Sequence, residues 1–104
     1  MLTQEKKQEV LELCTRLIQA ESYSGNEKAV GGILTDYFKA RGFDEVIVDG
    51  YGDVIGCVRG KRPGPRVLFD GHMDTVPVTD PEKWEYPPFE ASIHDGRMYG
   101  RGTS

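Results

Sequence analysis

A histidine and an aspartate two residues apart follow a short apolar run. The run is Val67–Asp70, and Gly71 separates it from His72-Met73-Asp74. A neutral imidazole is a good ligand for zinc and related divalent metals. Successive residues of a strand point to opposite faces, so His72 and Asp74 would point the same way if the strand geometry persists. The spacing therefore predicts a metal site.

Two roles are open to Asp74. It could bind a metal directly, or it could accept the proton on the second imidazole nitrogen and so orient His72. His72 also lies just beyond the end of a predicted strand, where sites gather in open α/β sheets. A structural histidine is the competing interpretation, because His-x-Asp arises by chance in many proteins. Asp70 could reach the same strand end, although polar termination of the strand is the simpler account.

Other residues with reactive side chains are weaker candidates. His94 adjoins the Asp95-Gly96 turn and is predicted to be an exposed hairpin residue. Cys14 and Cys57 suit no disulfide framework or C-x-x-C site, and we expect small buried hydrophobes at both positions. The glycine-rich segments lack the spacing or the lysine of nucleotide and phosphate loops. A phosphate- or nucleotide-binding domain is therefore disfavoured.

Two amphipathic helices are expected ahead of the motif. Apolar residues recur at helical spacing from about Thr3 to Ala20, which predicts the first helix. The second follows Ser24, which with Glu27 three residues on has the spacing of a capping box. Gly42 is expected to end it.

Strands and loops are expected to follow. Residues 44–49 and 54–58 flank a glycine-rich turn and are predicted to form a hairpin. The continuous apolar character of residues 66–70 predicts a buried central strand. Residues 78–90 read as a proline-rich loop whose aromatic residues pin it to the domain, with a role in a substrate cleft as second choice. Residues 91–94 and 97–99 flank Asp95-Gly96 and predict a second hairpin. We therefore expect an α/β fold, a mixed sheet with helices on its faces.

Length and charge narrow the possible functions. The 104 residues make one domain or part of one, and should bury roughly 65% of the unfolded surface. The net charge of −4 and the lack of a basic stripe argue against nucleic acid binding. The polar N-terminus lacks the apolar core of a secretory signal, and no apolar run is long enough to span a bilayer. We therefore expect a soluble, cytoplasmic protein that binds no membrane.

Taken together, the motifs resemble the M20 family of metallopeptidases, which includes acetylornithine deacetylase, succinyl-diaminopimelate desuccinylase and carboxypeptidases. Two blocks carry the resemblance: G-H-x-D-x-V-P within Phe69–Pro77, and Y-G-R-G within Asp95–Ser104, with Trp84 and Pro87-Pro88-Phe89 between them. The resemblance covers the entire chain but only the first part of a typical member. Residues 1–104 are thus identified as the N-terminal portion of a catalytic domain, without its remainder and without the lid or dimerisation domain.

The resemblance also implies the roles of individual residues. The family holds two metals, usually zinc, with cobalt or manganese as alternatives, bridged by an aspartate and a water. His72 matches a metal ligand, and Asp74 matches the catalytic carboxylate that orients it. The bridging aspartate would be the residue after Ser104, and a glutamate pair that supplies the general base and another ligand would come later. No residue matches a binding site for another cofactor.

The implied function is metal-dependent amide hydrolysis, of the deacylase or dipeptidase/carboxypeptidase type. N-acyl amino acids or small peptides would be the substrates of a metal-activated water, and a glutamate would pass the water's proton to the leaving amine. The full-length protein could be a homodimer. The chain alone is expected to be inactive, because one histidine cannot hold a catalytic metal tightly.

A non-catalytic α/β module for binding or assembly, which keeps only the scaffold, is the alternative. An aspartate directly after Ser104 and a later Glu-Glu pair would favour the enzyme. Their absence would exclude it.

Overall fold

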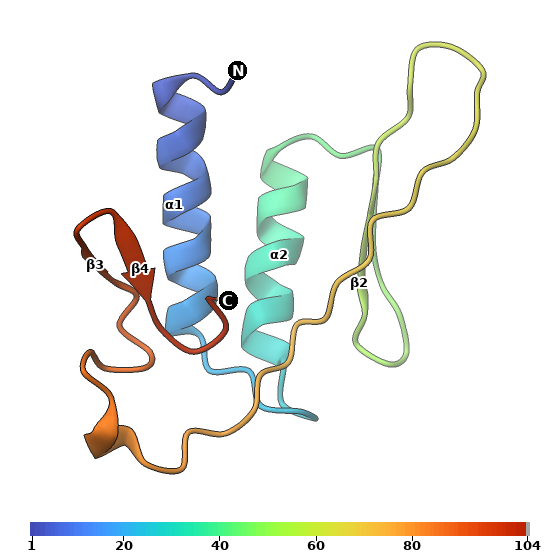
Figure 1. The fold of residues 1–104 in the computed structure, drawn as a ribbon. Coiled ribbons are helices and arrows are strands. Elements are labelled where there is room, and N and C mark those ends of the chain that lie inside the picture. Colours follow the sequence, from blue (N-terminus) through green and yellow to red (C-terminus); the bar gives the residue numbers. More distant parts are fainter. Residues whose placement is uncertain (104) are drawn as a thin grey trace.

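Two helices stand side by side, and each has a β-hairpin on its outer flank (Figure 1). The computed structural model describes residues 1–103. The helices are α1 (Gln4–Gln19) and α2 (Lys28–Ala40); the strands are β1 (Glu45–Val48), β2 (Val54–Cys57), β3 (Ser92–His94) and β4 (Arg97–Tyr99), with a short 3₁₀ helix η1 (Pro81–Lys83). This arrangement confirms the predicted α/β class, although the strands form two separate antiparallel pairs.

Helix α2 ends in a glycine motif, and two phenylalanines of this motif pack against the β1–β2 hairpin. Gly42 has a φ of 74°, and its N–H donates to the Lys39 carbonyl at 3.0 Å. The N–H of Phe43 donates to the Phe38 carbonyl at 3.1 Å, which completes a Schellman motif. The rings of Phe38 and Phe43 stack with centroids 4.5 Å apart. Gly42 therefore ends the helix as predicted, and the stacked pair faces β2.

The start of α2 differs from the prediction. The helix begins at Lys28, and its N-cap residue Glu27 makes no side-chain capping bond. The carboxylate of Glu27 instead accepts from the N–H of Gly25 at 2.8 Å. The predicted capping box is therefore wrong, because the hydroxyl of Ser24 has a different partner, described below.

Both predicted hairpins form. Val46 pairs with Gly56 and Ile47 with Ile55 in the first. In the second, Asp95 and Gly96 have φ values of 51° and 74°, the two positive angles that a type I′ turn requires.

The predicted central strand does not form. Residues 66–70 run as a lone segment past β2 (Figure 1), and no strand pairs with them within residues 1–103. Val67, Leu68 and Phe69 are 75%, 85% and 92% exposed. A strand needs a neighbour to satisfy its backbone N–H and C=O groups, and the described part of the chain supplies none here. The prediction of a buried central strand over residues 66–70 is therefore wrong for the described chain.

Surface measurements agree with this open architecture. The accessible area is 8546 Å² and the radius of gyration is 15.8 Å. Compact domains of this size have roughly 5,800 Å² and about 13 Å. About half of the unfolded surface therefore stays exposed, more than expected from length. The buried hydrophobic residues are Ile18, Val30 and Ala91.

The exposure of the cysteines and the character of the helices can be compared with the sequence predictions. Cys14 and Cys57 are free thiols at positions of intermediate exposure, so neither is as buried as predicted. Among the described residues, no helix combines the length and the apolar character that crossing a bilayer requires.

Carboxylates meet at the β1–β2 turn. One oxygen of Asp49 accepts from the N–H groups of Tyr51 and Asp53, both at 2.9 Å. The hydrogen bond from the Asp53 N–H is the main cause that lowers the pKa of Asp49. The negative charge of Asp49 in turn raises the pKa of Asp53, and the charge of Asp70 adds to that effect.

Replacing Gly56 should test how α2 is held on the hairpin. A Cβ at this position would lie 2.7 Å from Phe43 Cδ2 and 2.8 Å from Phe38 Cδ2, so Gly56→Ala must displace the stacked rings. We expect the free energy of unfolding, measured by urea titration, to fall by about 1–3 kcal/mol. The matched control is Gly32→Ala on α2, where a Cβ meets nothing within 4 Å. It should raise stability by roughly 0.5–1 kcal/mol. Equal stabilities for the two variants would contradict the packing.

The Asp49→Asn substitution should expose the coupling at the turn. The amide oxygen can still accept both backbone hydrogen bonds, but the negative charge is gone. We expect the pKa of Asp53, followed by NMR of its carboxyl carbon, to fall toward 3.8. Asp80→Asn, which removes a carboxylate paired with Lys83, is the control and should leave Asp53 unaffected. An unchanged pKa of Asp53 in Asp49→Asn would refute the coupling.

Candidate metal site

The chain after His72 is docked on the loop between α1 and α2. The N–H of Thr75 donates to the carbonyl of Ser22 at 2.7 Å. Tyr23 and Thr75 form an isolated parallel bridge. Ser22 is only 4% exposed, so the anchor is a buried residue in the loop that follows α1. The candidate site therefore sits where segments far apart in sequence meet.

His72 and Asp74 lie together. His72 Nδ1 is 2.8 Å from the backbone oxygen of Asp74 and 3.3 Å from its Oδ1. The side chains are 84% and 41% exposed. With Nδ1 turned toward Asp74, Nε2 is left as the nitrogen that can face a ligand. The nearer partner of Nδ1 is the backbone oxygen of Asp74, and the carboxylate lies close beside it.

A third side chain completes this cluster. Ser24 Oγ donates to the other carboxylate oxygen, Asp74 Oδ2, at 2.5 Å. This hydrogen bond is the main cause that lowers the pKa of Asp74, and the nearby His72 lowers it further. Sequence analysis missed Ser24, because its spacing to Glu27 indicated a helix cap. A polar side chain in a turn can satisfy a distant partner as well as a local one, and spacing along the chain does not distinguish the two.

The second motif block comes close to the first. A Cβ on Gly100 would lie 2.6 Å from Ile18 Cγ2 of α1, and the N–H of Arg101 donates to the Pro88 carbonyl at 2.7 Å. Gly102, with a φ of 91°, leaves only 3.1 Å between its Cβ position and Thr75 Cγ2. Glycines thus let the Y-G-R-G block approach α1 and the residue that follows Asp74.

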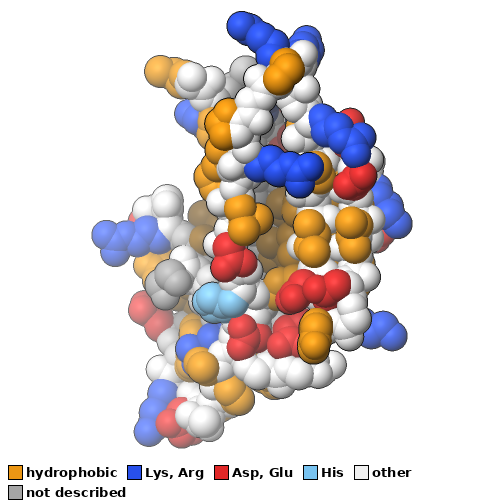
Figure 2. Space-filling view, turned by 90° about the vertical axis from the view of Figure 1, so that its right-hand side faces the viewer, with side chains coloured by type: hydrophobic (Ala, Val, Ile, Leu, Met, Phe, Trp, Pro, Cys, Tyr) orange, Lys and Arg blue, Asp and Glu red, His pale blue; other side chains and the backbone are white. Residues whose placement is uncertain are grey.

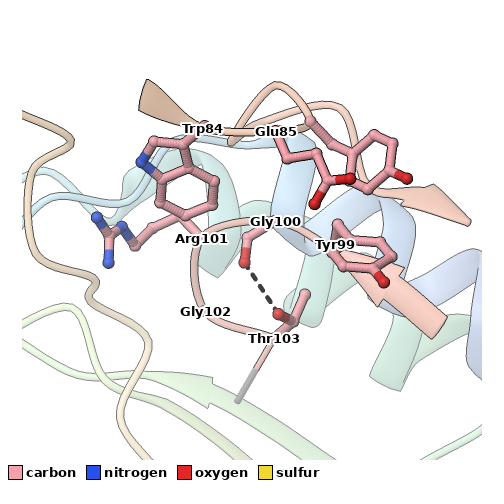
Figure 3. Close-up of a pocket in the computed structure, with 8 residues that line it drawn as sticks. Trp84, Glu85, Tyr99, Gly100, Arg101, Gly102 and Thr103 are labelled. Atoms are coloured by element: carbon pink, nitrogen blue, oxygen red, sulfur yellow. Dashed lines mark hydrogen bonds between the residues drawn. The ribbon is translucent and has the colours of Figure 1, made fainter. Parts of the chain in front are cut away.

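The loop before the second hairpin is pinned by its aromatic side chains, as predicted. Tyr86 stacks on His94 with centroids 3.9 Å apart, and Phe89 meets Tyr23 edge-on at 6.1 Å. The guanidinium of Arg101 lies 4.9 Å from the ring centre of Trp84. Figure 3 shows that Trp84 and Arg101 lie on one side of a hollow, and Glu85 and Tyr99 on the other. His94 is exposed in the hairpin, as expected.

Seen from the side of the β1–β2 hairpin, acidic side chains gather in the lower half beside a histidine, and hydrophobic side chains lie exposed above them (Figure 2).

Within residues 1–103, no three His, Cys, Asp or Glu side chains are grouped closely enough to hold a metal ion. His72 and Asp74 offer an imidazole and a carboxylate, donor types that suit a divalent metal. They make only part of the donor set that a bound metal needs.

Comparison with known proteins agrees with this geometry. The model of peptidase family M20/M25/M40 matches residues 68–104, the stretch that carries both motif blocks. Over 98 residues, the chain is 42% identical to succinyl-diaminopimelate desuccinylase of Hydrogenovibrio crunogenus and 37% identical to that of Pseudoalteromonas atlantica. Each match covers 92% of this chain and 26% of the relative. The chain therefore spans about a quarter of the length of these relatives, and its residues 68–104 match the model of peptidase family M20/M25/M40.

Proposed function

We propose that this chain supplies one histidine ligand, His72, and its orienting carboxylate, Asp74, to a metal-dependent amide hydrolase. The observation that carries the proposal is the pairing of His72 Nδ1 with Asp74 on an imidazole ring that is otherwise exposed. A ring held in this way presents Nε2 in one orientation and in one tautomer. Metal-binding histidines are commonly held by such a carboxylate.

The donor chemistry suits a divalent metal, and zinc is our first choice, with cobalt or manganese as alternatives. Imidazole nitrogen is a good zinc ligand. A bound metal would supply a Lewis acid that activates water and polarises the amide carbonyl. In this chain, His72 would hold the metal, and Asp74 would keep the ring turned and its Nδ1 protonated. The further ligands of a two-metal centre would come from the rest of the full-length protein.

The relatives favour a deacylase over a peptidase. Both matched proteins are named as enzymes that remove a succinyl group from an amino-acid derivative. We therefore place N-acyl amino acids, N-succinyl compounds among them, ahead of small peptides as substrates. We further propose a cytoplasmic full-length protein that forms a homodimer.

Substitution of the paired residues in the full-length protein tests the assignment. His72→Ala should abolish hydrolysis and reduce bound zinc, because it removes a ligand. Asp74→Ala should retain some zinc and lose turnover by roughly 10–100-fold, because it removes only the orienting group. The measurements are metal content and a hydrolysis screen with N-acetyl amino acids, N-succinyl amino acids and dipeptides.

The matched control is His94→Ala, which removes the other histidine, exposed in the second hairpin. It should keep both zinc and activity. If His72→Ala and Asp74→Ala behave like His94→Ala, neither residue belongs to the metal site.

The 104-residue chain, prepared alone, should show no hydrolysis, since it offers one histidine ligand. It should also bind a hydrophobic dye such as ANS, because the apolar segment Val67–Phe69 is exposed. Phe69→Ser in the same chain should reduce the dye fluorescence, whereas Tyr51→Ser, at an equally exposed position on the hairpin turn, should change it less. Hydrolysis by the isolated chain would contradict the expectation that one histidine ligand cannot support the reaction.

A further inference from the structure

The loop between α1 and α2 is shaped to present Ser24 to the candidate site. The N–H of Asn26 donates to the Tyr23 carbonyl at 2.8 Å, which closes a turn, and Gly25 has a φ of 84° within it. The Glu27 carboxylate bonds the Gly25 N–H, so it does not compete for the serine. The Ser24 hydroxyl is left to reach Asp74, 50 residues further along the chain.

Two further contacts stabilise the position of Ser24 next to Asp74. The Thr75 N–H bonds the Ser22 carbonyl, and Tyr23 bridges Thr75, so the backbone on either side of the Ser24–Asp74 pair is fixed. Because Ser22 is buried, the loop between α1 and α2 is packed against the rest of the molecule at this residue.

The two oxygens of Asp74 have different partners. Oδ2 accepts from Ser24, and Oδ1 lies 3.3 Å from His72 Nδ1. An ionised carboxylate can only accept hydrogen bonds, so Ser24 must be the donor. Oδ1 then stays close to the imidazole, whose Nδ1 has its hydrogen-bond contact with the Asp74 backbone oxygen at 2.8 Å. A carboxylate held at one oxygen loses the freedom to rotate the other away from His72.

We propose that Ser24 is a positioning residue of the metal site, which fixes the carboxylate of Asp74 so that Asp74 in turn fixes His72. This inference rests on the proposed function of the His72–Asp74 pair. It adds a segment that lies far from both motif blocks in sequence. Ser24 acts through Asp74 and touches neither metal nor substrate.

The test uses the full-length protein and three serine variants. Ser24→Ala should lower kcat by roughly 10-fold, near the lower limit for outer partners of a metal ligand, with little change in KM. It should also weaken zinc binding to the metal-free protein, measured by competition with a chromophoric chelator. Ser24→Thr keeps the hydroxyl and should restore both. Ser92→Ala removes a hydroxyl that bonds Glu90 in the second hairpin, and should change neither.

A double-mutant cycle distinguishes positioning from a general structural role. If Ser24 acts through Asp74, Ser24→Ala should cause no further loss of kcat or zinc affinity in a protein that already carries Asp74→Ala. The same fold loss in both backgrounds would overturn the proposal. Ser24 is solvent-exposed, so its truncation leaves no cavity, and we expect unchanged thermal unfolding of the variant. Should Ser24→Ala unfold nonetheless, Ser24→Cys, with a weaker donor, must show an intermediate kcat, and wild-type kcat in that variant would overturn the proposal.

The outcomes separate this inference from the proposed function. An active protein that is inactivated by His72→Ala but not weakened by Ser24→Ala would overturn the role of Ser24 alone. A protein whose zinc content and activity do not depend on His72 would overturn both.

Discussion

The hydrogen bond from the Thr75 N–H to the Ser22 carbonyl joins the chain after His72 to the end of α1. The other features of the site depend on this junction. It places Asp74 within reach of Ser24, and it places Thr75 where Gly102 of the second block can approach. Gly100 packs on Ile18 of the same helix. Both motif blocks therefore contact the last turn of α1 or the loop that follows it.

The cluster built on this platform is organised by hydrogen bonds more than by burial. Asp74 receives one donor at Oδ2 and faces the imidazole with Oδ1, and hydrogen bonds to a charged group are stronger than those between neutral groups. His72 itself is largely exposed, so water competes for its ring. Under the proposed function, such an arrangement would orient His72 before a metal binds. Tight metal binding requires further donors around the same point.

Several apolar side chains outside the His72–Asp74 cluster are also exposed to solvent. Val67–Phe69 and the outer positions of the first hairpin, Ile47, Val48 and Ile55, are about half or more exposed. Burial of such side chains is the main driving force of folding, so surfaces of this kind mark places where protein normally covers protein. By contrast, the inner side of the same hairpin is closely packed, where Gly56 meets the stacked rings of Phe38 and Phe43.

Local signals in the sequence determined most of the elements. Helical periodicity predicted α1 to within a residue or two, Gly42 predicted the end of α2, and Asp95-Gly96 predicted the second hairpin, because each depends on neighbouring residues alone. The spacing also predicted that His72 and Asp74 would point the same way, through a strand geometry that residues 72–74 do not have. Tertiary structure alone decided that Ser24 serves Asp74 and does not cap a helix, and that residues 66–70 lie exposed without a strand partner. Hydrogen-bond partners and burial depend on what lies nearby in space, and that is set by the fold and not by the order of residues along the chain.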